Sequence, residues 1–577
     1  MKRFPFKLLA ILPVLILLWL VWRYGVNLPV WDEWDTPGTT LVHNATQQMT
    51  WSDWIRQHNE SRKLFPRLLL VPLAGLTSWN IRSEMLISVF LACLISFNVY
   101  CLSKTTLNCS PRRRLAYLFL ANLLIFSPMQ WDNWLRGIQA IAFVPIACIT
   151  GSLAVIVAAN PLVLKFLVSG ILATIATFSL ANGMLSWIII LPSLILVTSK
   201  TKSRMKIGFM VLGWLALLGF NLGVYLHNYI QPALITTLRG SLFNPLQTIA
   251  NLLSFMGSPL GFYSRSANQL IGLITIGLFS AACFYVFKEQ RHLLARALPW
   301  ISIGVYGFIN CILIIAGGVS LGMGESLESR YITLASYSIL ALLYLLIIIS
   351  ENLNQGNLKP SPLGGLFSRI TSLLLIACLL VYPANLVWGA NRMIAVSQER
   401  LFAKACLIFI NHIDSPECLQ SQIFPQTDFL KQRATELNSL GYLQPALATS
   451  DRLNEIDGQN LLSIGYGSFD GFSRDDSGNY LASGWSILPK YSQPAHAVIL
   501  AYQTPDNIEH AFALAKPEVE RPDLVDTLGK QQYLKSGWTK SFPPELIPGD
   551  AIAIGAWAFD SKIGRAYKLN VFHPLQP

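Results

Sequence analysis

The stretch YITLASYSILALLYLLIIIS, residues 331–350, decides the fold class, because it is long, apolar and free of charged residues. A helix rises about 1.5 Å per residue, so about 20 such residues cross the hydrocarbon core of a bilayer. Similar runs recur near 7–26, 84–104, 115–128, 139–159, 162–181, 184–199, 207–226, 268–287, 297–316 and 370–390. The sequence therefore predicts a polytopic α-helical membrane protein with about 11 spans.

The composition of the 577-residue chain supports this class. Hydrophobic residues make up 53% and charged residues 13%, whereas soluble domains carry roughly 25% charged residues. The formal net charge is +12, but the basic residues lie in short loops between apolar runs, such as Arg112 to Arg114 and Lys200 to Lys206. This pattern indicates loops on the cytoplasmic side rather than nucleic-acid binding. The alternation of basic loops puts the N-terminus inside and the region after residue 390 outside.

Beyond the apolar part, the chain divides into two further regions. Residues 391–455 read as a helical extracytoplasmic linker, clearest over 398–413, and residues 456–577 read as a β-sandwich domain. The predicted strands are 461–466, 479–487, 497–502, 510–515, 537–542, 552–559 and 566–572. Cys406 and Cys418 follow the last apolar run, and a disulfide between them fits an extracytoplasmic position without being required by it.

An acidic motif opens the first external loop, where Trp31-Asp32-Glu33-Trp34-Asp35 follows the first apolar run directly. Three carboxylates lie within four positions, and a helix would place Asp32 and Asp35 on one face. Crowding at a membrane surface disfavours the ionised form of a carboxylate, which suits a general base. The alternative is an interfacial belt, in which tryptophans lie at the headgroup level and the acids face water.

A basic motif, His58-Asn59-Glu60-Ser61-Arg62-Lys63-Leu64-Phe65-Pro66-Arg67, follows in the same loop. On a helix, His58 and Arg62 would lie together, and arginine forks bind phosphate through two hydrogen bonds. Arg67 opens an apolar run, so it could instead be an arginine whose stem lies along the membrane surface.

Two later external segments add polar residues. In the first, Trp131, Asp132, Trp134 and Arg136 again place an acid between tryptophans, whose faces suit the apolar surface of a sugar ring. In the second, Arg330 stands at the outer mouth of a predicted span, where ionisable residues are candidates for function. An ion pair with Glu328 is the structural alternative for Arg330.

The acidic first loop, a second external acid, a late external arginine and a soluble C-terminal region together resemble the GT-C superfamily of membrane glycosyltransferases. The resemblance covers residues 1–390, which it implies to be the catalytic domain. The phrases HNESRKLFPRL, QWDNWLRGIQ, FSLANG and ESRY also resemble an uncharacterised group of bacterial, notably cyanobacterial, membrane proteins in or near that superfamily. The resemblance implies a multi-pass protein of the bacterial inner (plasma) membrane that transfers a sugar from a polyprenyl-phosphate donor on the extracytoplasmic face.

A mechanism follows as a hypothesis from this resemblance. Asp32 or Asp35 takes the proton of the acceptor hydroxyl, on a glycan, lipid or protein, as it attacks the anomeric carbon, while Glu33 orients the acceptor. The donor phosphate binds Arg67, Arg330, His58 and Arg62, and the substrate contacts Asp132, Trp131, Trp134 and Arg136. Two or three carboxylates would also suit Mg²⁺ or Mn²⁺, so the sequence leaves metal dependence open.

The rival interpretation is a transporter or flippase for a lipid-linked sugar or another polar substrate. Transporters place ionisable residues near the middle of the membrane and often contain repeated halves. Here the acids and arginines lie at the ends of predicted spans, and no repeat is visible, which favours an enzyme. In the sandwich, Trp485, Trp538, Trp557 and Tyr480 suit either carbohydrate stacking or an ordinary hydrophobic core.

Overall fold

The computed structural model describes residues 6–231, 245–261, 264–316, 325–355, 362–458 and 465–575. Contacts between residues divide the chain into two units. The helical unit comprises Met1–Gly25, Thr50–Leu70 and Arg82–Met393, and the C-terminal unit comprises Val26–Met49, Val71–Ile81 and Ile394–Pro577. The segment that carries the acidic motif therefore groups with residues after 394 rather than with the membrane helices.

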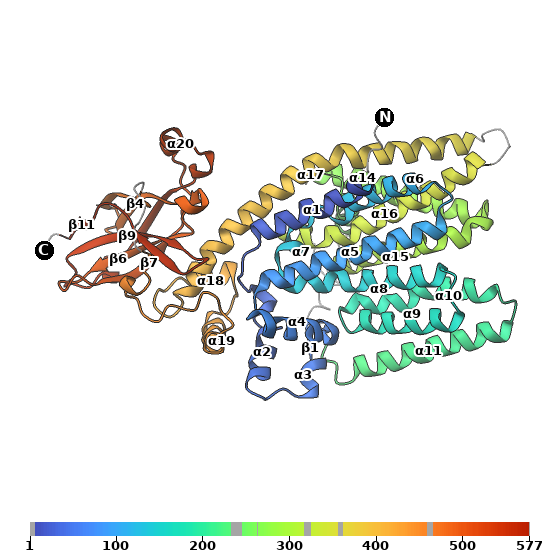
Figure 1. Ribbon diagram of the computed structural model, residues 1–577, viewed down its shortest axis with the longest axis horizontal. Helices are drawn as coiled ribbons and strands as arrows, with labels where there is room; N and C mark the ends of the chain where they lie inside the picture. Colours follow the sequence, from blue (N-terminus) through green and yellow to red (C-terminus); the bar gives the residue numbers. More distant parts are fainter. Residues whose placement is uncertain are drawn as a thin grey trace. The chain divides into compact units, whose positions relative to one another are not determined.

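The helical unit consists of long apolar helices that run alongside one another (Figure 1). Over the part of the chain that the structure describes, nine helices are long and apolar enough to cross a membrane. They are Lys7–Tyr24, Ile81–Thr106, Gly137–Val157, Ala181–Ser199, Arg204–Leu226, Arg265–Lys288, Arg291–Ile315, Ser329–Leu353 and Leu366–Ile408. The prediction of a polytopic α-helical protein is confirmed.

Nine candidate spans within the described residues compare with about 11 expected from the sequence. Two predicted runs form shorter helices, α6 (Pro111–Ile125) and α9 (Leu162–Thr177). Three arginines begin α6, which shortens its apolar part. The helices that lie outside the predicted apolar runs include α4 (Leu64–Thr77) and α13 (Pro245–Gly257).

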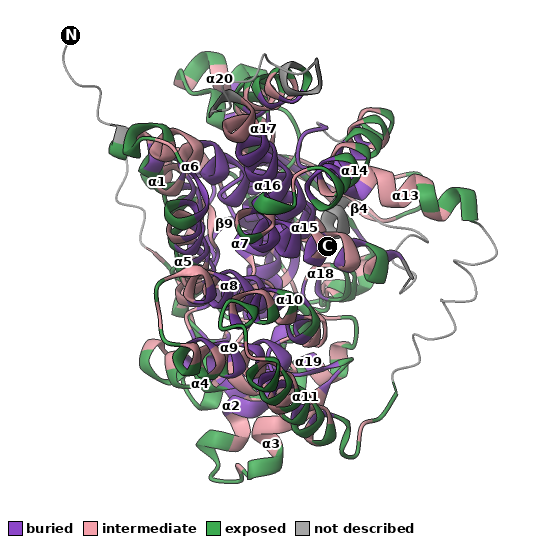
Figure 2. Cartoon of the chain, turned by 90° about the vertical axis from the view of Figure 1, so that its right-hand side faces the viewer, coloured by how far each residue is buried: buried purple, intermediate pink, exposed green. Residues whose placement is uncertain are grey.

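Helix α16 (Glu325–Gln355), which contains the stretch 331–350, lies in the middle of the helical unit. Figure 2 shows α16 as buried, and 94% of the residues in its most apolar 18-residue stretch are buried. A helix that is apolar on every side is expected to be enclosed in this way. Helix α15 (Leu294–Ala316) packs against it at Gly307, where a Cβ atom would lie 2.2 Å from Oγ of Ser338. Such small residues let membrane helices approach closely.

Helix α17 (Pro362–Ile408) belongs to the helical unit up to Met393 and to the C-terminal unit from Ile394. The helical stretch predicted at 398–413 is therefore largely the end of this long helix. Two shorter helices follow it, α18 (Pro416–Gln422) and α19 (Thr427–Ser439).

Two antiparallel sheets form the sandwich of the C-terminal unit. One has the strand order β10-β9-β6-β7 with β11 beside β9, and the other has the order β3-β4-β5 with β8 beside β4. The strands are β3 (Gly467–Arg474), β4 (Tyr480–Leu488), β5 (Gln493–Pro494), β6 (Ala497–Gln503), β7 (Glu509–Ala515), β8 (Gly537–Phe542), β9 (Ala553–Asp560), β10 (Arg565–Lys568) and β11 (His573–Pro574). Both sheets contribute to one hydrophobic core, which includes Phe469, Val498 and Trp538. The predicted β-sandwich is confirmed.

Most predicted strands agree with the structure. The predicted strand 461–466 lies mostly outside the described residues, and the first strand of the sandwich in the described part begins at Gly467. The register of that strand shifts between Ser468 and Gly471, which breaks the regular alternation that sequence reasoning needs. Trp538 and Trp557 are buried, so these two tryptophans are core residues and not exposed stacking platforms.

Candidate functional site

The acidic motif forms a short turn in the C-terminal unit rather than the helix considered from the sequence. Trp31–Glu33 is a single 3-10 turn, η1, and α2 begins only at Gly38. The carboxylate of Glu33 is buried and accepts the backbone N–H of Val30 at 2.7 Å. Asp32 is exposed, and Asp35 is half-buried with the hydroxyl of Thr39 3.5 Å away. Of the three acids, Asp32 is the one presented to solvent, whereas Glu33 stabilises the turn.

The backbone of the acidic motif is held in a costly conformation. Trp31 has φ of 54°, in the left-handed region, which costs a bulky residue about 1–3 kcal/mol and persists only where the surroundings impose it. Its N–H donates to the carbonyl of Ile423 at 2.7 Å. Trp34 is fully buried, donates to the carbonyl of Pro29 at 3.0 Å and meets the ring of Trp79 edge to face at 6.0 Å. Trp34 therefore serves packing, while Trp31 lies beside Asp32 at the surface.

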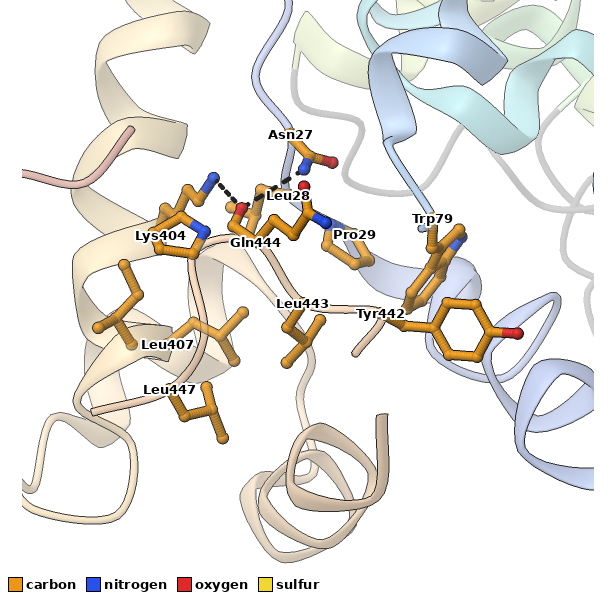
Figure 3. Close-up of a pocket in the computed structure, with 12 residues that line it drawn as sticks. Asn27, Leu28, Pro29, Trp79, Lys404, Leu407, Tyr442, Leu443, Gln444 and Leu447 are labelled. Carbon is orange, nitrogen blue, oxygen red and sulfur yellow. Dashed lines mark hydrogen bonds between the residues drawn. The ribbon is translucent and has the colours of Figure 1, made fainter. Parts of the chain in front are cut away.

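A small pocket lies just before the motif, lined by Asn27, Trp79, Tyr442 and Gln444 (Figure 3). Its volume is about 10 Å³, which is roughly the room of one water molecule. This pocket is a packing gap and is too small for a sugar.

In the helical unit, the structure brings Asp132 together with two arginines. One carboxylate oxygen of Asp132 lies 3.0 Å from Nη2 of Arg136, and the other lies 3.3 Å from Nε of Arg330. The side chain of Asp132 is only 1% exposed, that of Arg136 13% and that of Arg330 28%. Two guanidinium groups thus share one buried carboxylate, so Asp132, Arg136 and Arg330 together carry a net positive charge. Arg330 is the most exposed of the three side chains.

Hydrogen bonds fix this cluster to α16. The backbone N–H of Asp132 donates to Oγ of Ser329 at 3.2 Å, and Ser329 donates to the carbonyl of Met129 at 2.9 Å. The amide of Asn133 donates to the carbonyl of Arg330 at 2.8 Å and to Oγ1 of Thr333 at 2.7 Å. The phrases QWDNWLRGIQ and ESRY therefore form one structural element. The side chain of Glu328, considered as a partner of Arg330, lies outside the described residues.

Arg392 is a residue of this cluster that the sequence analysis missed. Its guanidinium lies 5.6 Å from the ring centre of Trp131 and 5.7 Å from that of Trp388, within the range of cation–π attraction. Gly389 allows this approach, because a Cβ atom there would lie 2.6 Å from the backbone of Pro128. The sequence did contain a signal for Arg392: it lies two residues after the last apolar run, at the end of a predicted span, as Arg330 does.

Trp131 and Trp134 have different environments. Trp134 is fully buried, donates to the carbonyl of Ser127 at 2.9 Å and stacks on Phe143 at 4.8 Å. It holds its loop in place. Trp131 is only 3% exposed, and its ring lies under the guanidinium of Arg392.

The basic motif forms a hairpin and not the helix considered from the sequence. Strands β1 (Gln57–His58) and β2 (Ser61–Arg62) pair across a turn in which Asn59 has φ of 52°. Asparagine tolerates this conformation well, which favours a tight turn over a helix. His58 pairs with Ser61 across the hairpin, and Nδ1 of His58 lies 2.9 Å from Nζ of Lys63.

Both arginines of the basic motif donate to backbone carbonyls. Arg62 donates to Tyr225 at 2.6 Å, to Ile55 at 3.0 Å and to His227. Arg67 donates to Trp54 at 3.1 Å and to Arg56 at 2.6 Å. These contacts tie together the loop that carries the motif.

The four sequence phrases meet in two pairs. The basic motif contacts FSLANG, because Ser61 accepts the N–H of Ala181 at 3.1 Å and the carbonyl of Phe178 accepts the N–H of Phe65 at 3.2 Å. The other pair is the Asp132 cluster.

The donor set does not fit a metal ion in the helical unit. The described residues contain no group of three or more His, Cys, Asp or Glu side chains that could hold one. The neighbours of Asp132 are arginines, which repel a cation. We therefore derive no step through Mg²⁺ or Mn²⁺.

No protein-family model matches the chain, and no curated protein matches it. A search of solved structures finds the archaeal oligosaccharyltransferase AglB from Archaeoglobus fulgidus, solved with an inhibitory peptide and a dolichol-phosphate, at 13% identity and a TM-score of 0.38 over 76% of this chain and 60% of that one. It also finds the arabinosyltransferase EmbB from Mycobacterium smegmatis, at 11% identity and a TM-score of 0.33 over 100% of this chain and 65% of that one.

By name, these two proteins are an oligosaccharyltransferase and an arabinosyltransferase. The chain spans less than two thirds of the length of either.

Proposed function

We propose that this chain is a membrane glycosyltransferase that moves a sugar from a polyprenyl-phosphate donor to an acceptor hydroxyl at the extracytoplasmic face. The observation that carries the proposal is the pair of arginines, Arg136 and Arg330, that shares the single buried carboxylate of Asp132. A buried cluster with excess positive charge, beside apolar helices, suits an anionic group attached to a lipid.

The phosphate is expected to bind at Arg330. Arg330 is the more exposed arginine partner of Asp132. It can therefore point an N–H group toward an oxygen of the phosphate, while Arg136 still neutralises the Asp132 carboxylate. Arg392 adds a third cation beside Trp131. Charge-assisted bonds from guanidinium to phosphate are strong and directional. Arg62, Arg67 and His58 remain proposed contributors, but their contacts with the surrounding loop favour a supporting role.

Asp32 is the proposed general base, with Asp35 as the second choice. The acceptor oxygen forms a bond to the anomeric carbon while the bond from that carbon to the phosphate oxygen breaks, and the acceptor proton passes to Asp32. The polyprenyl phosphate leaves with the electron pair and gains negative charge, which the arginines stabilise. A single displacement of this kind inverts the anomeric centre. Asp132 and Trp131 then orient the substrate.

The Cys406–Cys418 disulfide supports the proposed orientation. Disulfides persist outside the reducing cytoplasm, and the basic loops independently predict that the region after residue 390 lies outside. A bacterial inner-membrane location with a cytoplasmic N-terminus satisfies both.

The test is sugar transfer from a labelled polyprenyl-phosphate sugar by the purified protein in lipid vesicles. Asp32→Asn is expected to abolish transfer while binding of polyprenyl phosphate stays within about twofold, because it removes a proton acceptor and leaves the phosphate contacts intact. Arg474→Gln, at an exposed arginine of the sandwich, serves as the control. Movement of the labelled lipid across the vesicle without transfer would favour the flippase interpretation instead. If Asp32→Asn, Asp35→Asn and the double variant all transfer sugar as fast as the wild-type protein, the assignment of the general base to these residues is refuted.

A further inference from the structure

A disulfide lies one short helix away from the acidic motif. Cys406, near the end of α17, is bonded to Cys418 in α18, with Cα atoms 6.5 Å apart. Ile423 follows α18 directly and is completely buried. Its carbonyl accepts the N–H of Trp31 at 2.7 Å. The disulfide thus fixes the helix whose end holds the first residue of the acidic motif.

The C-terminal unit also holds the chain at Asn27, four residues before Trp31. The carbonyl of Gln444 accepts hydrogen bonds from Asn27 at 3.4 Å and from Lys404 in α17 at 2.8 Å (Figure 3). Asn27 in turn accepts the N–H of Ile81 at 2.8 Å. The segment from Asn27 to Trp31 is therefore anchored at both ends by residues that follow 394.

We infer that the disulfide-bonded pair α17–α18 is a positioning element for the acidic motif, so that the C-terminal unit sets where Asp32 lies. This inference rests on the proposed function, in which Asp32 is the base. Neither cysteine is expected to touch a substrate. Their effect passes through Ile423 to Trp31, whose left-handed backbone needs an outside contact to persist.

The expected consequence is local. The contact of Glu33 with Val30 and that of Trp34 with Pro29 lie within the motif and do not involve α18. Loss of the Ile423 contact would therefore release Trp31 and the adjoining Asp32 while the rest of the turn stays formed. A catalytic group displaced by about 1 Å costs on the order of 100-fold in rate, whereas donor binding by the arginines should not change.

The experiment compares the wild-type protein with Cys406→Ser/Cys418→Ser, each as the full chain in lipid vesicles. The matched control is Cys93→Ser, at a cysteine that forms no disulfide in the structure. Wild-type protein treated with dithiothreitol gives a second route to the same state: two electrons and two protons pass to the disulfide, yielding two thiols, and the reagent becomes its cyclic disulfide. Reoxidation then tests rescue.

We expect kcat to fall at least about tenfold in the double variant, with the affinity for polyprenyl phosphate unchanged. This fall in kcat should reverse when the reduced wild-type protein is reoxidised, whereas an irreversible loss of active protein would not recover. An unchanged kcat would overturn the inference, as would a parallel loss of donor binding.

Hydrogen–deuterium exchange of the peptide covering residues 28–36 separates the two proposals. Faster exchange there in the double variant, with the sandwich strands still protected, supports the positioning role whether or not the protein transfers sugar. Equal exchange in both proteins contradicts it. Absence of transfer by the wild-type protein would instead count against the proposed function alone.

Discussion

The Nε atom of Arg330 lies 3.3 Å from a carboxylate oxygen of Asp132, although the two residues belong to distant parts of the chain. Asp132 is buried and also pairs with Arg136 at 3.0 Å. A buried carboxylate that loses a partner keeps its desolvation cost, so each member of the cluster depends on the others. This dependence makes the cluster both a fixed structure and a site that variants can test.

We expect Arg330→Gln to lower kcat/KM for the donor by about 100- to 1,000-fold, equivalent to roughly 3–4 kcal/mol, because in the proposed mechanism it removes the charge that stabilises the leaving phosphate. Arg330→Lys keeps the charge but loses the fork, so it should recover only part of this loss. Initial rates at several donor concentrations measure both variants. Equal rates for wild type and Arg330→Gln would exclude phosphate contact by this residue.

Arg392 offers an independent test of the same site. Arg392→Lys keeps a positive charge but forms weaker contacts with the flat rings of Trp131 and Trp388. We expect Arg392→Gln to weaken binding of polyprenyl phosphate more than Arg392→Lys does, and Trp388→Leu to weaken it as well. The readout is the affinity for polyprenyl phosphate in detergent. Arg433→Gln, which removes an arginine lying over Phe429, should have no effect and is the control.

Variants of Glu33 are expected to change the stability of the C-terminal unit, whereas variants of Asp32 are expected to change turnover. Glu33→Ala removes the acceptor of the Val30 N–H, and loss of such a turn contact costs about 0.5–2 kcal/mol. We expect a lower thermal midpoint of the C-terminal unit with Glu33→Ala and an unchanged midpoint with Asp32→Asn. Glu33→Gln keeps a carbonyl acceptor and should behave more like the wild type. A stable Glu33→Ala protein with abolished turnover would show a chemical role for Glu33 instead.

The C-terminal unit should lose stability in mild acid. His496 is buried and lies 3.1 Å from Asp560, and burial lowers the pKa of His496 below its ordinary value of 6.5 despite that carboxylate. The folded protein therefore binds the proton less readily than the unfolded chain. This contribution to stability is complete well above pH 6.5 and is lost as pH falls below 6.5 toward the folded pKa.

Thermal unfolding of the whole protein between pH 7.5 and pH 5, a window of about one unit or more on either side of the ordinary histidine pKa, measures this effect. His496→Asn should flatten the dependence, and His412→Asn, at an exposed histidine, should leave it unchanged. A wild-type midpoint independent of pH over this range would contradict the assignment. Asp560 acts at lower pH: burial is the largest single influence and raises its pKa, but the contacts with His496, the backbone N–H of Lys562 and Tyr491 together lower the pKa of Asp560 below 3.8.

The membrane class, most of the long apolar helices and most strands of the sandwich could be predicted from the sequence because they depend on local patterns. Apolar runs such as 331–350 have one stable state in a bilayer, which is a helix that satisfies its own backbone. Alternating patterns such as 537–542 fit a strand with one buried face. The acidic motif was also visible, since a dense group of carboxylates needs no partner to be noticed.

The roles of individual residues were decided only by tertiary contacts. The sequence could not show that Glu33 accepts its own turn's N–H, that Arg62 and Arg67 donate to backbone carbonyls, or that Arg392 lies over Trp131. It left open the disulfide that the structure forms between Cys406 and Cys418. Hydrogen bonds and ion pairs act over about 3 Å, so residues far apart in sequence acquire partners only when packing brings them together.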